Sequence, residues 1–222
     1  MRNLALMWVL AGCLLGCGGK PSYTKFTDTR DGKVYKIVKI GSQTWFAENL
    51  NYAVEGSVCY ENNARNCVKY GRLYNWNDAN SACPTGWHLP LDIEWTMLEN
   101  YVKKESGCRI CEGTKLKSTK GWGWRSSGTN DFGFSAFPGG YGTSEGNFYY
   151  AGIGGFWWSA TDGYFYDTGA EGIWWRAADG DAYDAFYWNM SASYDGAGLD
   201  HYNKTILFSV RCVQDNEKEV QK

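Results

Sequence analysis

Apolar residues recur at helical spacing on both sides of a Pro-Thr-Gly turn in the segment Trp76–Trp95 and just beyond it. This pattern predicts two short helices, each with one buried face. The recurring residues are Trp76, Ala79 and Cys83 in the first helix and Trp95, Leu98 and Val102 in the second. Gly107 ends the second helix, and both helices need a partner to pack against.

Runs of β-branched and aromatic residues, bounded by glycine and polar turns, predict the strands of a sheet. These runs are Lys33–Ile40, Gln43–Ala47, Gly155–Thr161, Ala185–Met190 and Ile206–Val213. In the last run, Phe208, Val210 and Cys212 alternate and therefore share one strand face. We expect this face to be the partner of the two helices and the last run to close the sheet.

The remaining segments predict loops and chain ends. The polar segment Val58–Tyr70 and the glycine-dense segment Thr143–Gly155 are the two long loops. A chain of 222 residues supports one domain, which we place at residues 31–215. Residues 17–30 are expected to be a polar tether, and residues 216–222 a charged, disordered tail.

Residues 1–16 form an export signal. Arg2 precedes an apolar run from Leu4 to Leu15, which is too short to cross a bilayer as a helix. Cys13 and Cys17 each follow a Leu-x-Gly context that resembles a lipid-attachment signal. We predict lipidation at Cys17, with Cys13 and a secretory signal without lipid as alternatives. The expected location is the bacterial cell envelope, lipid-anchored at the outer membrane or the cell surface.

Apart from the lipidation candidates Cys13 and Cys17, the chain has six cysteines, and an even number is typical of a disulfide framework in an exported protein. Cys108 and Cys111 have the spacing of a zinc or redox pair. A zinc site lacks further ligands, because the chain has only 2 histidines and no second pair of this spacing. A redox pair lacks a thioredoxin-like setting. Structural disulfides are therefore favoured.

The composition argues against a nucleic-acid partner and favours a core of aromatic side chains. Acidic and basic residues nearly cancel at a net charge of −2, which argues against nucleic acid as a partner. Aromatic residues make up 17% of the chain, with 12 Trp and 16 Tyr beside 28 Gly. In such a composition, aromatic side chains fill a core beneath glycine-rich turns.

Several motifs agree in order with one protein family. They are Trp87-His88-Leu89-Pro90 with Glu94-Trp95, Phe134-Ser135-Ala136 with Pro138-Gly139-Gly140, Trp157-Trp158-Ser159, and Phe208-Ser209-Val210-Arg211-Cys212-Val213. With these motifs the chain resembles the Fibrobacter succinogenes major paralogous domain from about Asp31 to Asp215. Compared with that family, the segment Gly163–Ala182 resembles an insertion.

The resemblance implies a fold and one disulfide. The family is similar to C-type-lectin-like and formylglycine-generating-enzyme-like proteins. We therefore expect an α+β domain with two helices packed on small antiparallel sheets and long ordered loops. In such folds a cysteine after the first helix pairs with one in the last strand, which implies a Cys83–Cys212 bridge. For the other four we choose Cys59–Cys67 across a polar loop and Cys108–Cys111 across a tight turn.

Aromatic and acidic residues alternate between Asp162 and Asp200, a pattern that suits carbohydrate binding. Flat sugar faces stack on Trp and Tyr rings, while carboxylates and amides bind hydroxyl groups. The competing interpretation is that the aromatic residues pack in the core and that the Asp-Gly pairs form turns. Our candidate ligand-binding residues are Trp174, Trp175, Asp179, Asp181 and Trp188.

Metal and catalytic sites find less support in the sequence. The tripeptide of calcium-dependent lectins is absent, so no cofactor is expected, although the acidic loops leave calcium open. His88 lies between apolar residues and suits packing, while His201 has no serine or cysteine partner at a recognisable spacing. The pair Asp179 and Asp181 is of a kind too common in acidic loops to indicate glycoside hydrolysis.

We therefore expect a non-catalytic envelope lipoprotein, anchored to the membrane by lipid, that binds carbohydrate or another surface polymer through its loops. One alternative is a module that binds a partner protein of the envelope. The other is an oxidase of the formylglycine-generating type, which the resemblance brings in. That chemistry needs a reactive cysteine, which a complete disulfide framework does not leave.

Overall fold

The computed structural model describes residues 20–123, 128–167, 173–177 and 183–215. Within these ranges the helical segments are η1 (Tyr60–Asn62), α1 (Ala64–Tyr70), α2 (Trp76–Ala82), α3 (Asp92–Ser106) and α4 (Glu112–Leu116). None of the described helices is long and apolar enough to cross a membrane. The candidate lipidation residues Cys13 and Cys17 and the tail 216–222 lie outside the described residues.

The strands are short, apart from two in the second half of the chain. They are β1 (Tyr23–Thr27), β2 (Val34–Ile40), β3 (Gln43–Phe46), β4 (Leu73–Tyr74), β5 (Trp87–His88), β6 (Tyr141–Gly142), β7 (Phe148–Tyr149), β8 (Gly154–Asp167), β9 (Ile173–Ala177), β10 (Asp184–Ser191), β11 (Gly198–Asn203), β12 (Phe208–Ser209) and β13 (Val213–Gln214). Helices and mainly antiparallel strands in one chain make the predicted α+β fold.

The first sheet has the strand order β1-β2-β3-β13-β5, and all its neighbouring strands are antiparallel. Strands β2 and β3 form a hairpin, because Gly41 turns the chain with a φ of 61°. Val38 lies opposite Trp45 in this hairpin, and both pack with the apolar face of α3. The sheet thus provides the partner that the second predicted helix needs.

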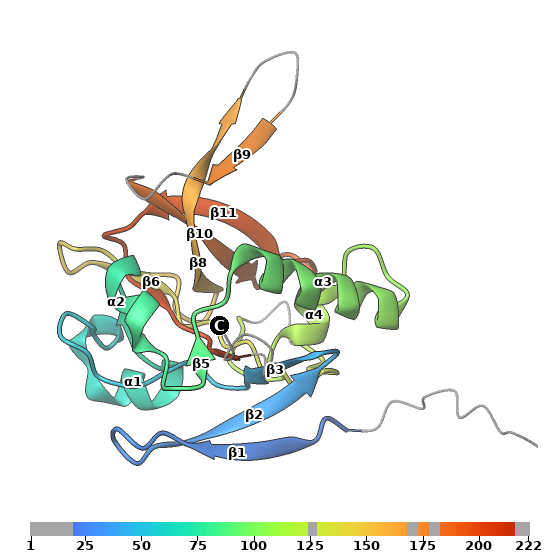
Figure 1. Cartoon of the computed structure of the whole chain (residues 1–222), viewed down its shortest axis with the longest axis horizontal. Coiled ribbons are helices and arrows are strands. Elements are labelled where there is room, and N and C mark those ends of the chain that lie inside the picture. Colours follow the sequence, from blue (N-terminus) through green and yellow to red (C-terminus); the bar gives the residue numbers. More distant parts are fainter. Residues whose placement is uncertain (1–19, 124–127, 168–172, 178–182, 216–222) are drawn as a thin grey trace, which may run out of the picture.

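The second sheet has the order β11-β10-β8-β12-β4, and β9 pairs with the far half of β8. Strand β12 runs parallel to β8, while the other pairs are antiparallel. Figure 1 shows the β8–β9 hairpin projecting beyond the body of the molecule. The paired part of this hairpin lies within Gly163–Ala182, the segment expected to be an insertion.

Two buried clusters fill the space between the sheets and the helices. The neighbours Trp157 and Trp158 point to opposite sides of β8, so each enters a different cluster. Trp45 and Phe46 of β3 divide in the same way. Aromatic side chains therefore fill the cores on both sides of these strands, which accounts for much of the high aromatic content.

The C-terminal run Ile206–Val213 does not form the single closing strand that the sequence predicts. Its first part becomes β12 in the second sheet, and its end becomes β13 in the first sheet. Between these two strands, the Cys212 carbonyl accepts a hydrogen bond from the Phe46 amide at the end of β3, and the Val210 carbonyl accepts one from the Leu50 amide. Phe208, Val210 and Cys212 still enter one core cluster together, as their alternation predicts.

Two segments expected to be loops contain short elements. Helix α1 forms within Val58–Tyr70, because Asn63 accepts a hydrogen bond from the Arg65 amide and caps the first turn. Gly71 ends this helix at a φ of 77°. The glycine-dense segment Thr143–Gly155 contains β7, which pairs with β6 to form a two-stranded hairpin.

The expected tether, residues 17–30, is corrected by strand β1. All five residues of β1 pair in register with β2, and the Phe26 ring packs on Phe46 and Trp87. Asp28 is buried after the strand and accepts hydrogen bonds from the Arg30 side chain. The folded part therefore begins several residues earlier than the sequence predicts.

The structure confirms the three predicted disulfides. They are Cys59–Cys67, Cys83–Cys212 and Cys108–Cys111. The Cys83–Cys212 bridge joins the end of α2 to the crossing between β12 and β13, across a sequence separation of 129. The other two span separations of 8 and 3 and staple local turns.

Candidate functional site

The residues proposed to bind carbohydrate fall into three groups in the structure. Trp174 and Trp175 lie on β9, where their backbones pair with Tyr166 and Phe165 of β8. Asp179 and Asp181 lie outside the described residues. The fifth residue, Trp188, lies on β10 in the second sheet.

Trp188 is buried, which corrects its assignment as a binding residue. It is 1% exposed and stacks on Trp95 of α3, with ring centroids 5.2 Å apart and planes 14° apart. Strands β8 and β11 flank β10 on both edges, and α3 covers this face of the sheet. The side chain is therefore part of the core and has no surface to offer a polymer.

A different group of aromatic residues reaches the surface beside the second sheet. Tyr141 of β6 pairs with Tyr149 of β7, and their ring centroids lie 5.4 Å apart. The centroid of the Tyr150 ring lies 5.9 Å from that of Tyr141. Tyr149, Tyr150 and Tyr202 of β11 are 45%, 55% and 49% exposed. We call these four residues the tyrosine surface.

Buried aromatic rings support the tyrosine surface from below. Phe156 of β8 makes an edge contact with Tyr141 and stacks on Phe208, with centroid distances of 5.3 Å and 5.5 Å. Tyr187 of β10 also contacts Phe208, and its hydroxyl donates a hydrogen bond of 3.3 Å to the Asp200 carboxylate. The surface rings therefore rest on a rigid layer, with a carboxylate beside them.

Two phenols of this region, Tyr141 and Tyr187, have pKa values above the ordinary value of tyrosine. Burial raises the pKa of Tyr141, and the neighbouring phenols of Tyr202, Tyr150 and Tyr149 raise it further. Burial and the Asp200 carboxylate raise the pKa of Tyr187 as well. Tyr202 lies two residues from Asp200 on β11 and therefore on the same face of this strand, whose Asp200 pairs with Tyr187. The hydroxyls of Tyr141 and Tyr187 are thus neutral hydrogen-bonding groups at neutral pH.

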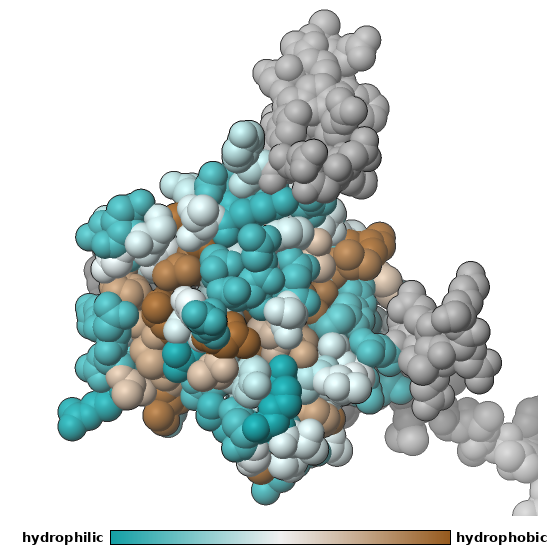
Figure 2. Space-filling view, turned by 60° about the vertical axis from the view of Figure 1, so that its left-hand side comes forward, coloured by the Kyte–Doolittle hydropathy of each residue, from teal (hydrophilic) through white to brown (hydrophobic). Residues whose placement is uncertain are grey.

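A polar hollow adjoins the opposite face of the β6–β7 hairpin, where Phe148 faces away from the tyrosine surface. Its volume is about 500 Å³. The polar residues that line it are Asn62, Asn75, Asn77, Asp78, Thr143, Ser144, Lys204 and Thr205. Figure 2 turns this side toward the reader and shows apolar residues interspersed with hydrophilic ones. Amide, carboxylate and hydroxyl groups thus lie close to the aromatic surface.

The two histidines hold structural contacts. His88 contacts Asp215 at 2.6 Å and Glu94 at 2.9 Å through its two ring nitrogens. Hydrogen bonding to Glu94, opposed by burial and assisted by Asp215, raises the pKa of His88 to about 9. His201 lies on β11, with its Nδ1 2.9 Å from the Asp184 carboxylate. Both histidines therefore have carboxylate partners.

In the described part of the chain, every cysteine is in a disulfide and no cluster of side chains is placed to bind a metal ion. The disulfides engage all six cysteines of the described residues. Among the described residues, no group of three or more His, Cys, Asp or Glu side chains is placed to hold a metal ion.

A comparison with protein families shows the family of this chain. A family model described as the Fibrobacter succinogenes major domain matches residues 38–214. The chain belongs to this family. No curated protein and no solved structure matches the chain.

The Fibrobacter succinogenes major domain of this chain spans almost all of both sheets. The match begins within β2 and ends with β13, so β1 lies outside it. It includes the tyrosine surface, the polar hollow and the β8–β9 hairpin. Family membership and the α+β architecture are thus shown, while similarity to C-type lectins stays a prediction.

Sequence reasoning did not find the tyrosine surface of this Fibrobacter succinogenes major domain. The neighbours Tyr149 and Tyr150 gave no clear local signal, because the adjacent aromatic residues Trp157 and Trp158 are both buried, one on each side of β8. Tyr150 has a positive φ of 63°, which brings its ring to Tyr141 together with that of Tyr149. Tyr141 and Tyr202 join them only through strand pairing and the packing of the second sheet.

Proposed function

We propose that this protein is a non-catalytic lipoprotein of the bacterial cell envelope that binds a carbohydrate polymer on the tyrosine surface. The observation that carries the proposal is the group of half-exposed tyrosines around Tyr141. Contiguous aromatic rings at a surface are a typical mark of a binding site, since water solvates their faces poorly.

The chemistry of this region suits sugars in two ways. Tyrosine rings offer flat faces for the C–H faces of pyranose rings, and their hydroxyls add hydrogen bonds. The Asp200 carboxylate and the side chains of the polar hollow supply acceptors and donors for sugar hydroxyls. Rigid support by Phe156 and Phe208 limits the entropy lost when a ligand binds.

The β8–β9 hairpin supplies a second contact region in this proposal. Its two tryptophans, Trp174 and Trp175, remain candidates from the sequence. Strand β8 begins beside the tyrosine surface at Phe156 and continues into the hairpin. A polymer, unlike a single sugar, is long enough to contact more than one such region of a protein.

The non-catalytic part of the proposal is supported by the cysteines. An oxidase of the formylglycine-generating type needs a reactive thiol, and the disulfides engage all six cysteines that the structure describes. Thiol titration of the unreduced protein tests this point. One persistent reactive thiol would revive the oxidase alternative.

The first prediction is retention of the protein on insoluble polysaccharide, tested with cellulose, xylan and pectin. We expect wild type to be retained on at least one of them. Tyr149→Ala/Tyr150→Ala should bind at least about tenfold more weakly, because it removes two stacking rings worth about 1 kcal/mol each. Tyr194→Ala is the matched control, since Tyr194 is 53% exposed but lies beside Lys117 and Gly196, apart from the tyrosine surface.

A Trp174→Ala/Trp175→Ala variant separates the two regions. Loss of retention in this variant alone would move the site to the hairpin. Loss in both double variants would indicate one extended site. If wild type is retained on no polymer, the proposal fails, and the alternative of a partner protein in the envelope takes its place.

A further inference from the structure

Helix α3 turns an unusually apolar face to solvent. Its inner face is buried through Trp95, Leu98 and Val102. On the opposite face, Ile93, Met97 and Tyr101 follow one another at spacings of four residues, which aligns them along the helix. They are 60%, 45% and 36% exposed. A helix at a water-facing surface normally carries charged residues at such positions.

The middle of the outward face of α3 also lacks carboxylates. At 100° per residue, the arc opposite the core holds Ile93, Thr96, Met97, Asn100, Tyr101 and Lys104. Of the acidic residues at its flanks, Glu94 bonds to His88 and Glu99 to Lys103, while Glu105 is exposed next to Lys104. The outward face therefore carries a row of apolar side chains beside the polar Thr96 and Asn100, and charges of both signs at its C-terminal end.

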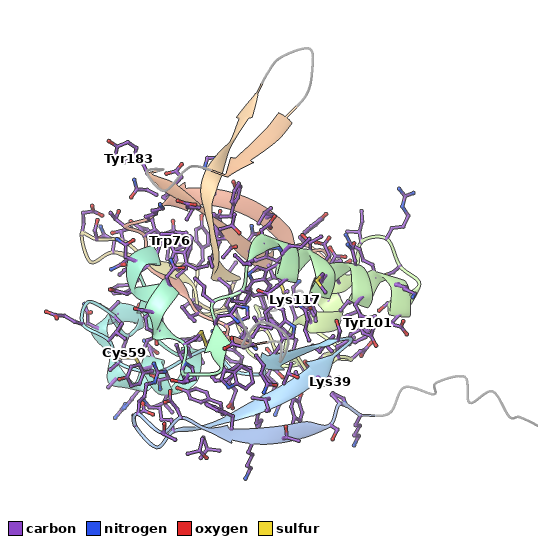
Figure 3. All side chains as sticks on the ribbon, in the orientation of Figure 1. Lys39, Cys59, Trp76, Tyr101, Lys117 and Tyr183 are labelled. Atoms are coloured by element: carbon purple, nitrogen blue, oxygen red, sulfur yellow. A yellow bond between two sulfur atoms is a disulfide. The ribbon has the colours of Figure 1, made fainter. Side chains whose placement is uncertain are left out.

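The described chain begins beside this face. Lys20 and Pro21 line a hollow together with Glu105, Ser106 and Phe132, and the Phe132 ring lies 6.1 Å from Tyr101. Figure 1 shows β1 starting on the side of the molecule to which the C-terminal end of α3 points. Figure 3 shows Tyr101 and Lys39 on that same side. The N-terminal segment thus joins the fold next to the outward face of α3.

The proposed lipid anchor puts this side of the molecule close to a bilayer. Cys17 precedes Lys20 by three residues, and an extended chain covers at most about 3.6 Å per residue. Lys20 therefore lies within about 11 Å of a lipidated Cys17. Because β1 uses residues that were expected to form a tether, the domain has little freedom to move away from the membrane.

We infer that the outward face of α3 rests on the lipid surface to which the chain is anchored. Ile93 and Met97 enter the boundary between headgroups and acyl chains, and Tyr101 lies at the headgroup level. Lys104 and Lys20 face anionic headgroups. The inference uses the proposed lipidation only for the position of the membrane and does not depend on carbohydrate binding.

Vesicle flotation tests the inference with a chain that begins at Lys20, so that neither leader nor lipid contributes. Every described strand, helix and disulfide lies within this chain, and intact disulfides with a wild-type circular dichroism spectrum confirm folding of each variant. The vesicles contain phosphatidylethanolamine and phosphatidylglycerol. We expect wild type to float with them and Ile93→Asn/Met97→Asn to bind at least about tenfold less.

Val34→Asn/Val68→Asn is the matched control, because Val34 and Val68 are 54% and 85% exposed on other elements. It should float like wild type. Absence of flotation by wild type, or equal loss in both double variants, would overturn the inference. A wild-type dimer that Ile93→Asn/Met97→Asn dissociates, without any flotation, would assign the face to a second copy instead. Polysaccharide retention should be the same in all these variants, which keeps this test separate from the proposed function.

Discussion

His88 connects the C-terminal strand to the start of α3 through two carboxylates. Its pKa is raised to about 9 in the folded state, chiefly by hydrogen bonding to Glu94, from an ordinary value of 6.5. A raised pKa means that the protonated ring stabilises the fold. This contribution is complete below the unfolded pKa of 6.5 and is lost as the pH rises through about 9.

We predict that wild type loses stability relative to His88→Gln between about pH 6 and pH 10. One pKa unit corresponds to about 1.4 kcal/mol, and solvent screening of the partly exposed ring reduces the total to about 1–2 kcal/mol. Urea unfolding of both proteins across this range measures the difference. Parallel pH profiles for the two proteins would show that His88 does not contribute in this way.

Arg211 is a charged residue that is fully buried in the core. Its guanidinium is 0% exposed and donates hydrogen bonds to the carbonyls of Phe46 and Phe134 and to the Asn49 amide oxygen, at 3.0, 2.5 and 2.8 Å. Burial lowers the pKa of Arg211 to about 9, so the group remains charged at neutral pH. It thereby fixes the segment between β12 and β13 against the end of β3.

Arg211→Met should destabilise the fold by about 2–4 kcal/mol, because it leaves several buried acceptors without a donor. Thermal or urea unfolding gives the size of the effect. Arg109→Met is the control, since Arg109 is exposed and its loss should change the free energy of unfolding by no more than about 0.5 kcal/mol. Equal effects of the two substitutions would contradict the role of Arg211.

Among the helices and strands, the periodicity of apolar residues predicted those elements that bury one whole face. Helices α2 and α3 and strands β2, β3, β8 and β10 all follow apolar patterns in the sequence. Strand β1 gave no such signal, because four of its five residues are exposed and its strand state comes from pairing with β2. Helix α1 has seven residues and buries only Cys67 and Tyr70, too few for a periodic pattern.

The division of the run Ile206–Val213 into β12 and β13 could not be predicted from the local sequence either. Alternation continues through Phe208, Val210 and Cys212, although the partners of the backbone change from one sheet to the other. The candidate site shows the same limit. A pattern of aromatic residues cannot distinguish Trp188, which is buried, from Tyr202, which is half exposed, because the difference is set by which strands pair.

At the scale of the whole molecule, the disulfides differ in what they constrain. Cys83–Cys212 restricts most of the unfolded chain, and the loop-entropy estimate for its separation of 129 is about 5 kcal/mol. For Cys108–Cys111, with a separation of 3, the corresponding value is about 2 kcal/mol. We predict that Cys83→Ala/Cys212→Ala lowers the unfolding free energy more than Cys108→Ala/Cys111→Ala. Chemical unfolding measures both, and a reversed order would contradict this assignment.

The position of β12 and β13 has a consequence for how the protein is made. β12 lies between β8 and β4, and β13 lies between β3 and β5, so residues 208–214 complete the middle of both sheets. A chain leaves the ribosome with its N-terminus first. Neither sheet can therefore be completed until nearly the whole chain has been synthesised. Late completion of the fold would suit the export that we propose for this chain, because an exported chain is threaded through a channel before it folds.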